Sequence, residues 1–169
     1  KNVFRDAESL TADMLCDNLK LYDHALGRIV GETQFGSANK IVPLTGRMLF
    51  ELDHAFRRHC LGFTQPMVKA SFLKEKNINY VLHYRSGEDF LFLAEIILNG
   101  ARAFIVPNAD YVYIHRVSPS TREFSPTSRA DKGFVGIRDA DNYIWEKYGA
   151  IMSAAEKNAL KKRQQAAID

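Results

Sequence analysis

The sequence predicts an α/β fold of the mixed α+β kind, on three observations. Strand-like alternation and helical three- and four-residue spacing are interspersed along the chain, which argues against a helix bundle or a β-sandwich. The chain has 169 residues, 46% hydrophobic and 25% charged. That is enough for one domain with a substantial core, and it excludes disordered and collagen-like classes. The sequence contains no internal repeat and no low-complexity tract.

Charge and cysteine content narrow the functional classes. Lys+Arg 23 against Asp+Glu 20 gives a net charge of +3, a mild excess that does not predict nucleic-acid binding. Cys16 and Cys60 cannot build a disulfide framework or a four-ligand zinc site and favour a reducing cytosol. The apolar run at 90–98 is too short to span a membrane and contains Glu95. The chain begins at Lys1 rather than Met, so we expect it to be part of a longer protein.

The first third of the chain predicts a strand, a hairpin and a helix. After a polar, frayed start, residues 12–22 predict one strand, and residues 28–31 return antiparallel after a turn. Pro43 and Thr45 introduce the first clear helix, which Gly62 ends. Its apolar stripe consists of Met48, Leu49, Leu52, Phe56 and Cys60.

The middle of the chain predicts two helices and a buried strand. Residues 71–76 predict one or two helical turns. Ser86 followed three residues later by Asp89 is a near match to a capping box, and it predicts the start of a helix that Gly100 ends. The apolar run at 103–106 predicts a buried strand.

The last third predicts one more strand, a loop and two helices. The strand at 111–117 places Tyr111, Tyr113 and His115 on one face and Val112 and Ile114 on the other. Residues 118–132 are rich in Ser, Thr, Pro and Arg and predict a loop. One helix ends at Gly149, and the last one opens with a capping box at Ser153 and Glu156.

The motif search leaves one candidate for catalysis. The sequence has no Gly-rich phosphate loop, dinucleotide fingerprint, nucleophile elbow or cysteine pair at metal spacing. Glu88 and Asp89 are adjacent carboxylates at the start of a predicted helix, where amide groups stabilise an ionised base. The structural alternative is that Asp89 caps the helix and Glu88 is simply favoured in a first turn.

Several short motifs, taken in order, resemble the C-terminal half of the family 2 glycosyltransferases. The resemblance covers about residues 10–120 and is greatest with bacterial enzymes that build succinoglycan-type exopolysaccharide. The motifs are the Gly-Glu-Asp string at 87–89, the Gly-Ala turn and Pro-ended strand at 100–107, the tyrosine-rich strand at 111–113, and two upstream segments at 12–18 and 65–73.

The resemblance implies a fold and an activity. The fold is the acceptor-side portion of a GT-A domain, at residues 1–132, with a C-terminal helical extension at 133–169. The activity is inverting transfer of a hexosyl-type group from a nucleotide-diphosphate sugar to a hydroxyl of a lipid-linked saccharide, at the cytoplasmic face of the membrane. The family's Asp-x-Asp motif normally lies in the half that is absent here. A divalent Mg or Mn would therefore take its ligands mostly outside this chain, and we expect no transfer by this chain alone.

The resemblance also implies roles for particular residues. Asp89 is the expected base, and Glu88 beside it is a neighbour that could contact the acceptor. The expected diphosphate side is His115 or Arg116, and the expected acceptor side is Gln65, Lys69 and Arg85. The alternatives are that His115 packs beside Tyr113 and that the acceptor-side residues only line the surface.

Three other charged groups have a structural interpretation that we favour. Asp139 and Asp141 match the letters of Asp-x-Asp but lie in a predicted helix, where a solvated face is expected. Arg122 and Arg129 lie in the predicted loop, which could close over a donor, although a disordered loop is the structural alternative. The last helix could touch anionic lipid, although a solvated helix or linker is favoured; its cations are Lys157, Lys161, Lys162 and Arg163.

Two other functions are compatible with the sequence. The first is a non-catalytic module that binds carbohydrate or nucleotide on the face of Tyr111, Tyr113 and His115, because sugars stack on aromatic rings. The second is an interaction domain whose C-terminal helices are buried in an oligomer.

Overall fold

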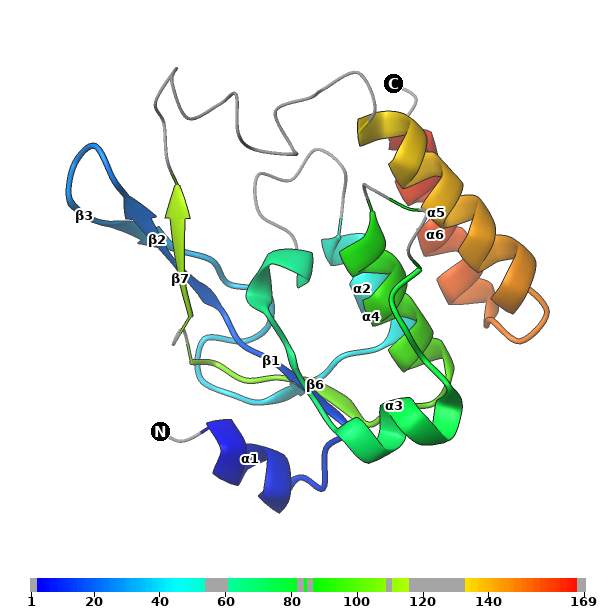
Figure 1. The fold of residues 1–169 in the computed structure, drawn as a ribbon, viewed down its shortest axis with the longest axis horizontal. Helices are drawn as coiled ribbons and strands as arrows, with labels where there is room; N and C mark the ends of the chain where they lie inside the picture. Colours follow the sequence, from blue (N-terminus) through cyan, green and yellow to red (C-terminus); the bar gives the residue numbers. More distant parts are fainter. Residues whose placement is uncertain are drawn as a thin grey trace.

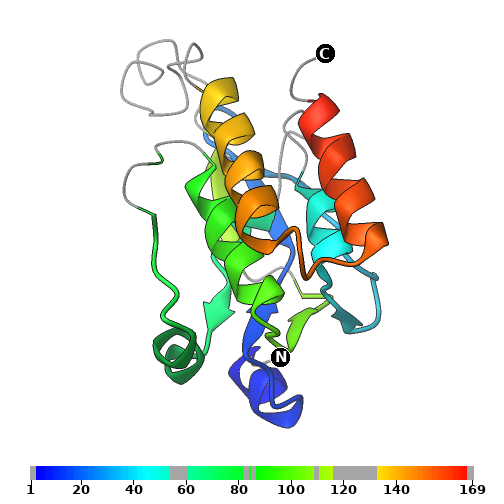
Figure 2. The same ribbon diagram turned by 90° about the vertical axis from the view of Figure 1, so that its right-hand side faces the viewer.

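The structure is a computed structural model that describes residues 3–53, 61–81, 84, 87–108, 111–115 and 133–166. It contains two small mixed β-sheets. The helices at 46–52, 88–98, 133–148 and 154–166 contact one another and form a layer beside these sheets, whereas the helix at 3–9 lies apart from this layer, next to the strand at 14–16 (Figures 1 and 2). The predicted mixed α/β class is therefore confirmed. In chain order the elements are α1 Val3–Ser9, β1 Met14–Cys16, β2 Leu19–Asp23, β3 Arg28–Glu32, β4 Val42–Pro43, α2 Gly46–Leu52, the 3₁₀ helix η1 Leu61–Thr64, β5 Met67–Val68, α3 Ala70–Lys76, α4 Glu88–Leu98, β6 Ala103–Ile105, β7 Tyr111–His115, α5 Gly133–Tyr148 and α6 Ala154–Ala166.

The first sheet has four strands in the order β4-β6-β1-β5. β1 is central: it runs parallel to β6, with Met14 opposite Ala103, and antiparallel to β5, with Met14 opposite Val68. All three residues of β1 are buried, as expected for an apolar strand flanked on both edges.

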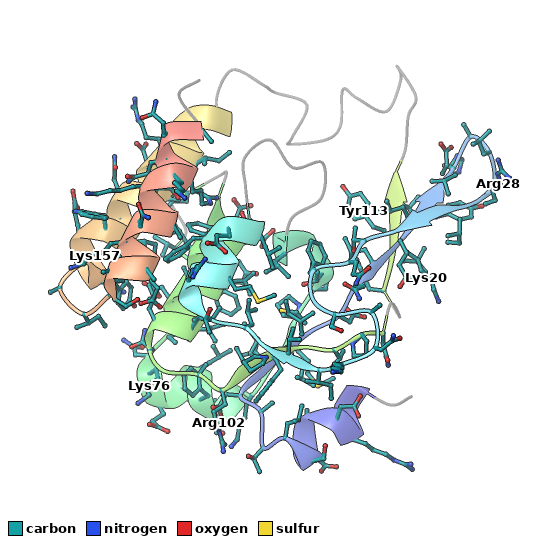
Figure 3. The ribbon with its side chains drawn as sticks, turned by 180° about the vertical axis from the view of Figure 1, so that it is seen from behind. Lys20, Arg28, Lys76, Arg102, Tyr113 and Lys157 are labelled. Carbon is teal, nitrogen blue, oxygen red and sulfur yellow. The ribbon has the colours of Figure 1, made fainter. Side chains whose placement is uncertain are left out.

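The second sheet has three strands in the order β3-β2-β7. β2 pairs antiparallel with β3, which confirms the predicted hairpin, and parallel with β7. The carboxylate of Asp23 accepts from the amides of Ala25 (2.8 Å) and Leu26 (3.0 Å) and so shapes the turn. The alternation predicted for β7 holds at its centre, where Val112 and Ile114 are exposed whereas Tyr113 packs against the core (Figure 3). Tyr111, predicted on the same face as Tyr113, is exposed at the start of the strand.

The single strand predicted at 12–22 is wrong, because the chain passes from one sheet to the other at residues 17 and 18. The carboxylate of Asp17 accepts from the amide of Tyr111 at 3.3 Å. The side chain of Asn18, which is 2% exposed, accepts from the amide of Phe35 at 2.8 Å. These side chains satisfy backbone groups of other segments, so the strand is interrupted where two polar residues interrupt the apolar run.

Two further expectations about the first third need correction. The polar start is not frayed throughout, because residues 3–9 form α1. The predicted helix does begin at Thr45, whose hydroxyl accepts from the amide of Met48 at 3.2 Å. That helix ends at Leu52 rather than near Gly62, since Asp53 leaves the helical conformation and Gly62 lies in η1. The predicted stripe residues Phe56 and Cys60 lie outside the described residues.

The start of α4 also differs from the expectation. Its N-cap is Gly87, at φ 82° and without a side-chain cap, and Ser86 lies outside the described residues. The carboxylate of Asp89 accepts from the hydroxyl of Tyr80; the capping box predicted between Ser86 and Asp89 involves a residue outside the described ranges. The predicted end is confirmed, because Gly100 follows the helix at φ 86°. The capping box of α6 is confirmed too: Glu156 accepts from the amide of Ser153 at 2.8 Å, and Ser153 accepts in return at 3.3 Å.

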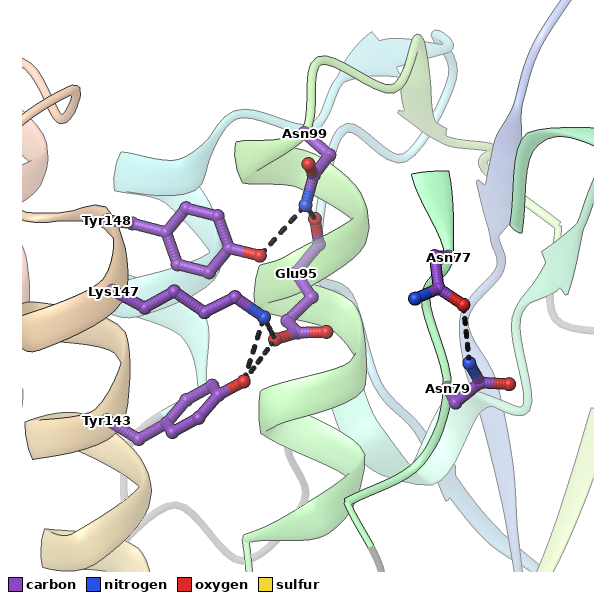
Figure 4. A network of polar contacts seen from close by, with 7 residues as sticks. All are labelled: Asn77, Asn79, Glu95, Asn99, Tyr143, Lys147 and Tyr148. Carbon is purple, nitrogen blue, oxygen red and sulfur yellow. Dashed lines mark hydrogen bonds and ion pairs between the residues drawn. The ribbon is translucent and has the colours of Figure 1, made fainter. Parts of the chain in front are cut away.

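A polar network joins α4 to α5 (Figure 4). The buried carboxylate of Glu95 accepts from the hydroxyl of Tyr143 at 2.8 Å and from the ammonium of Lys147. One turn further along, the amide of Asn99 donates to the hydroxyl of Tyr148 at 2.9 Å. Glu95 therefore occupies the middle of an apolar helix without being left unpaired.

The C-terminal helices share one core with the rest of the described chain. α6 packs on α2, and α5 packs on α4. Ala140, Ile144, Ala159 and Leu160 belong to the same cluster of buried residues as Phe90 and Leu91 of α4. The predicted division at residue 132 falls outside the described residues and stays a prediction. Among the helices of the described part, none is long and apolar enough to cross a bilayer.

Candidate functional site

Asp89 lies in the first turn of α4, where the helix begins beside η1. Asp89 is exposed, whereas the next residue, Phe90, is buried and anchors the helix. Free amide groups and the positive end of the helix dipole surround this position, and they favour an ionised carboxylate. The carboxyl group is therefore rigidly held and still open to solvent.

Tyr80 is the hydrogen-bond donor to Asp89. Its hydroxyl lies 3.2 Å from Oδ1 of Asp89, and its ring stacks on Phe92 with centroids 4.3 Å apart. Burial raises the pKa of Asp89 above its usual range; the hydrogen bond from Tyr80 lowers it, and the charges of Glu88 and Asp53 raise it again. The net direction is upward, toward a stronger base.

Gly62 of η1 forms the other side of the carboxylate. A Cβ atom at Gly62 would lie 3.0 Å from Cβ of Asp89, and its backbone amide donates to Oδ2 of Asp53 at 3.4 Å. A side chain at position 62 would press on Asp89, so glycine favours this close approach of η1 to α4. Asp53, which ends α2, thus lies directly behind the candidate base.

A buried ion cluster lies under this part of the site. Arg163 of α6 is 2% exposed and pairs with Asp53 at 3.1 Å and with Asp141 of α5. The guanidinium also lies 3.6 Å from the ring centroid of Phe90, a cation–π contact. One residue of α6 therefore connects α2, α4 and α5 at the base of the candidate site.

This cluster overturns two expectations about charged helix faces. Asp141 is fully buried rather than solvated, whereas Asp139 is half-exposed as expected. Arg163 is buried, and α6 is packed rather than a solvated linker, although Lys157, Lys161 and Lys162 do not belong to its buried face. Burial raises the pKa of Asp141 to about 7, against the lowering influence of Arg163.

Gln65 and Tyr111 line one small cavity of about 180 Å³. Gln65 follows η1 and adopts a left-handed conformation at φ 50°, which is uncommon for a non-glycine residue. Asp17 and Thr64 also line this cavity. An aromatic ring beside amide and carboxylate groups is the chemistry that recognises a sugar ring. The cavity lies at the end of the same 3₁₀ helix that contacts Asp89.

Lys69 lies at a different place from Asp89. It precedes α3, which lies toward the C-terminal end of α4 (Figure 1). It lines a larger cavity of about 550 Å³ between α1 and the first sheet, together with Asp13 and Arg102. The structure therefore does not bring Lys69 together with Asp89.

The other predicted site residues are described in part or not at all. His115 ends β7, with its backbone opposite Asp23. Its side chain, Arg85 and Arg116 lie outside the described residues, as does the predicted loop at 118–132. Within the described ranges, no group of three or more His, Cys, Asp or Glu residues could hold a metal ion. Asp141 is committed to Arg163 and does not fit such a role.

Sequence reasoning missed four residues around Asp89, namely Tyr80, Gly62, Asp53 and Arg163. The first three carry no local motif, because each contacts Asp89 or its neighbours only through the fold. Arg163 did carry a signal: it lies three and four residues after Leu160 and Ala159, on the buried face of α6.

Comparisons with known proteins agree with the expected resemblance. No family model matches the chain. It is 28% identical over 110 residues to the succinoglycan biosynthesis protein ExoU of Rhizobium meliloti, covering 62% of this chain and 31% of ExoU. It is 26% identical over 116 residues to ExoO of the same organism, covering 67% of this chain and 32% of ExoO. The chain thus spans about a third of the length of the curated relatives it matches.

Solved structures agree with the expected fold. The crystal structure of S. aureus TarS 1-349 in complex with UDP-GlcNAc aligns with 97% of this chain and 44% of its own, at a TM-score of 0.61 and 19% identity. A second crystal structure of S. aureus TarS 1-349 aligns with 97% of this chain and 42% of its own, at a TM-score of 0.57 and 19% identity. The chain therefore shares its mixed α/β fold with TarS, and the expected resemblance to succinoglycan biosynthesis proteins is confirmed.

Proposed function

We propose that this chain is the acceptor-side part of an inverting glycosyltransferase of bacterial exopolysaccharide biosynthesis, with Asp89 as its base. One observation carries the proposal: an exposed carboxylate stands at the start of α4, held by Tyr80 and bordered by Gly62, within a glycosyltransferase fold. The similarity to ExoU and ExoO supports the setting in polysaccharide synthesis.

The proposed reaction is a single displacement. Asp89 accepts the proton of an acceptor hydroxyl while that oxygen forms a bond to the anomeric carbon of the donor sugar. The bond from that carbon to the diphosphate oxygen breaks, and the diphosphate leaves with the electron pair. Attack opposite the leaving group inverts the anomeric configuration. The carboxylate must lie within about 3 Å of the hydroxyl, which a rigid helix start provides.

The environment of Asp89 suits this task. A free aspartate has a pKa near 3.9 and is a weak base. Burial and the charges of Glu88 and Asp53 raise its pKa, while the hydrogen bond from Tyr80 keeps the rise in check. A base is most effective when it is ionised at working pH and still binds a proton readily. Glu88, half-buried beside it, is the proposed acceptor contact.

The donor side of the proposal concerns the nucleotide sugar and its leaving diphosphate. A nucleotide-diphosphate sugar is the proposed donor, and the fold shared with TarS, which was crystallised with UDP-GlcNAc, supports that class. His115 or Arg116, after the tyrosine-rich strand, would stabilise the departing diphosphate. A divalent Mg or Mn would neutralise the diphosphate when bound; its ligands are proposed to lie mostly outside this chain, and Asp141 does not supply one.

The acceptor is proposed to be a lipid-linked saccharide, handled at the cytoplasmic face of the membrane. Gln65 and Tyr111, which line one cavity at the end of η1, are the described residues suited to contact it. Arg85 is an expected acceptor contact outside the described residues. Lys69 lines a separate cavity between α1 and the first sheet, so we do not propose it as an acceptor contact.

Replacing the base tests this proposal in the full-length protein. In Asp89→Asn we expect kcat to fall by about 10²–10⁴, the usual contribution of a general base, with donor affinity retained. Asp139→Asn, at a half-exposed acid of α5, is the matched control and should keep wild-type turnover. The same assay on residues 1–169 alone should show no turnover. Normal kcat in Asp89→Asn, together with sugar binding at the cavity of Gln65 and Tyr111, would instead favour the non-catalytic binding module.

A further inference from the structure

Tyr80 contacts two residues of α4: its hydroxyl bonds to the proposed base, and its ring stacks on Phe92. The hydroxyl donates to Oδ1 of Asp89 at 3.2 Å, and the ring stacks on Phe92 with an interplanar angle of 10°. Asp89 and Phe92 are three residues apart on α4 and therefore share one face. The phenol thus lies along this face of α4, with its hydroxyl at the carboxylate.

The segment that carries Tyr80 is anchored two residues earlier. Asn77 ends α3 in a left-handed conformation at φ 51°, and the buried Ile78 then donates from its amide to the carbonyl of Leu73 at 2.9 Å. Tyr80 itself is 49% exposed. Its ring is placed by the stack and the hydrogen bond rather than by deep burial, so it lies at the surface where an acceptor would arrive.

Electrostatics make this hydroxyl a permanent donor. Burial and the neighbouring charge of Asp89 raise the pKa of Tyr80 to about 12, so it keeps its proton throughout the working pH range. The bond lowers the pKa of Asp89, whereas burial raises it. Tyr80 therefore stabilises the ionised form of the carboxylate, which is the form that accepts a proton.

The second carboxylate oxygen faces a glycine. A Cβ atom at Gly62 would lie 3.9 Å from Oδ2 of Asp89, an ordinary contact distance. The backbone of Gly62 therefore borders this oxygen without bonding to it, because its amide donates to Asp53 instead. With Oδ1 engaged by Tyr80, Oδ2 is the oxygen suited to the acceptor hydroxyl. We infer that Tyr80 is a positioning residue that orients the carboxylate of Asp89 toward the acceptor. This inference rests on the proposed function, and Tyr80 itself neither gives nor takes a proton in the reaction.

Tyr80→Phe in the full-length protein isolates the hydroxyl, because phenylalanine keeps the stack on Phe92. We expect kcat to fall roughly tenfold, as for the loss of one hydrogen bond to a charged group. The acid limb of the pH–rate profile should move to higher pH, since the lost bond had lowered the pKa of Asp89. A ¹³C NMR titration of the Asp89 carboxyl should show the same upward move without any substrate.

Tyr84→Phe is the matched control. Its ring contacts Tyr143 and its hydroxyl donates to a backbone carbonyl of α5 at 3.5 Å, so kcat and the carboxyl titration should stay at wild-type values. An unchanged titration of Asp89 in Tyr80→Phe would overturn the inference. So would an unchanged kcat and acid limb in Tyr80→Phe while Asp89→Asn is inactive. If Asp89→Asn keeps the wild-type kcat, the proposed function fails, whatever the NMR titration of Tyr80→Phe shows.

Discussion

Three aspartates near the start of α4 end in three different environments. Asp89 is exposed and bonded to Tyr80. Asp53 is buried and paired with Arg163 and the amide of Gly62. Asp141 is fully buried, and its Oδ2 has no hydrogen-bond partner among the described residues. The same side chain is therefore suited to take a proton, to hold a turn or to balance a charge, and burial and partners decide which.

Asp141 makes stability depend on pH. Its pKa is raised from 3.8 to about 7 in the folded state, so the folded chain binds this proton more tightly than the unfolded chain. That stabilisation is complete below pH 4 and is lost as the pH rises through 7. In Asp141→Asn, the advantage of wild type over the variant should shrink between pH 4 and 7, by up to about 1.4 kcal/mol per pH unit.

Urea unfolding of both proteins at several pH values measures this change. Asp139→Asn, the half-exposed acid of the same helix, should follow the wild-type curve. A constant difference between wild type and Asp141→Asn across this range would show that Asp141 does not titrate there.

At the scale of elements, caps and glycines decide where helices begin and end. α6 begins at the reciprocal bonds between Ser153 and Glu156, α4 begins at Gly87 and is followed by Gly100, and both glycines have positive φ. A Cβ at Gly87 would lie 3.1 Å from Cβ of Ala140, so glycine also lets α5 approach the start of α4. The position of Asp89 therefore depends on a glycine N-cap that tolerates this contact.

The capping box of α6 should contribute measurably to stability. Ser153→Ala removes the side-chain acceptor for the amide of Glu156 and the hydroxyl that donates to its carboxylate. We expect the free energy of unfolding to fall by about 0.5–2 kcal/mol, as measured by urea unfolding. Ala155→Ser, at the exposed first turn of the same helix, is the control and should change stability by less than about 0.5 kcal/mol. Equal stability of wild type and Ser153→Ala would contradict a role for the cap.

At the scale of the whole molecule, α6 connects the end of the chain to the proposed site. Arg163 pairs with Asp53, which is 110 positions away in the chain, and with Asp141, which is 22 positions away. Its guanidinium also lies over the ring of Phe90, the residue next to Asp89. The cations of the surface are distributed differently: Lys157 lies on the outer side of the helices and Arg28 on the distant hairpin (Figure 3). The buried arginine thus joins the packing of the helices to the geometry of the base.

Arg163→Met should strongly destabilise the chain. It leaves Asp53 and Asp141 buried without their cation, a loss of about 3–5 kcal/mol, which thermal or urea unfolding would detect. Lys162→Met, the exposed neighbour, should change stability by less than about 0.5 kcal/mol. Similar stability of Arg163→Met and Lys162→Met would argue that the ion cluster does not support the fold.

Features encoded within a few residues were determined by the sequence itself. The hairpin after Asp23, the alternation of β7, the capping box of α6 and the glycine after α4 all follow from local spacing and turn chemistry. The Gly-Glu-Asp string and the motifs around it likewise indicated the fold and the similarity to succinoglycan biosynthesis proteins, because a motif consists of residues that are neighbours in the sequence.

Only the tertiary structure decided the features that depend on distant partners. Each of these features requires another segment of the chain to be in place. They are the split of residues 12–22 between two sheets, the early end of α2, the burial of Asp141 and Arg163, and the contact of Tyr80 with Asp89. The physical reason is that local propensity involves neighbours within one or two turns, whereas burial and ion pairing depend on which surfaces meet once the chain has folded.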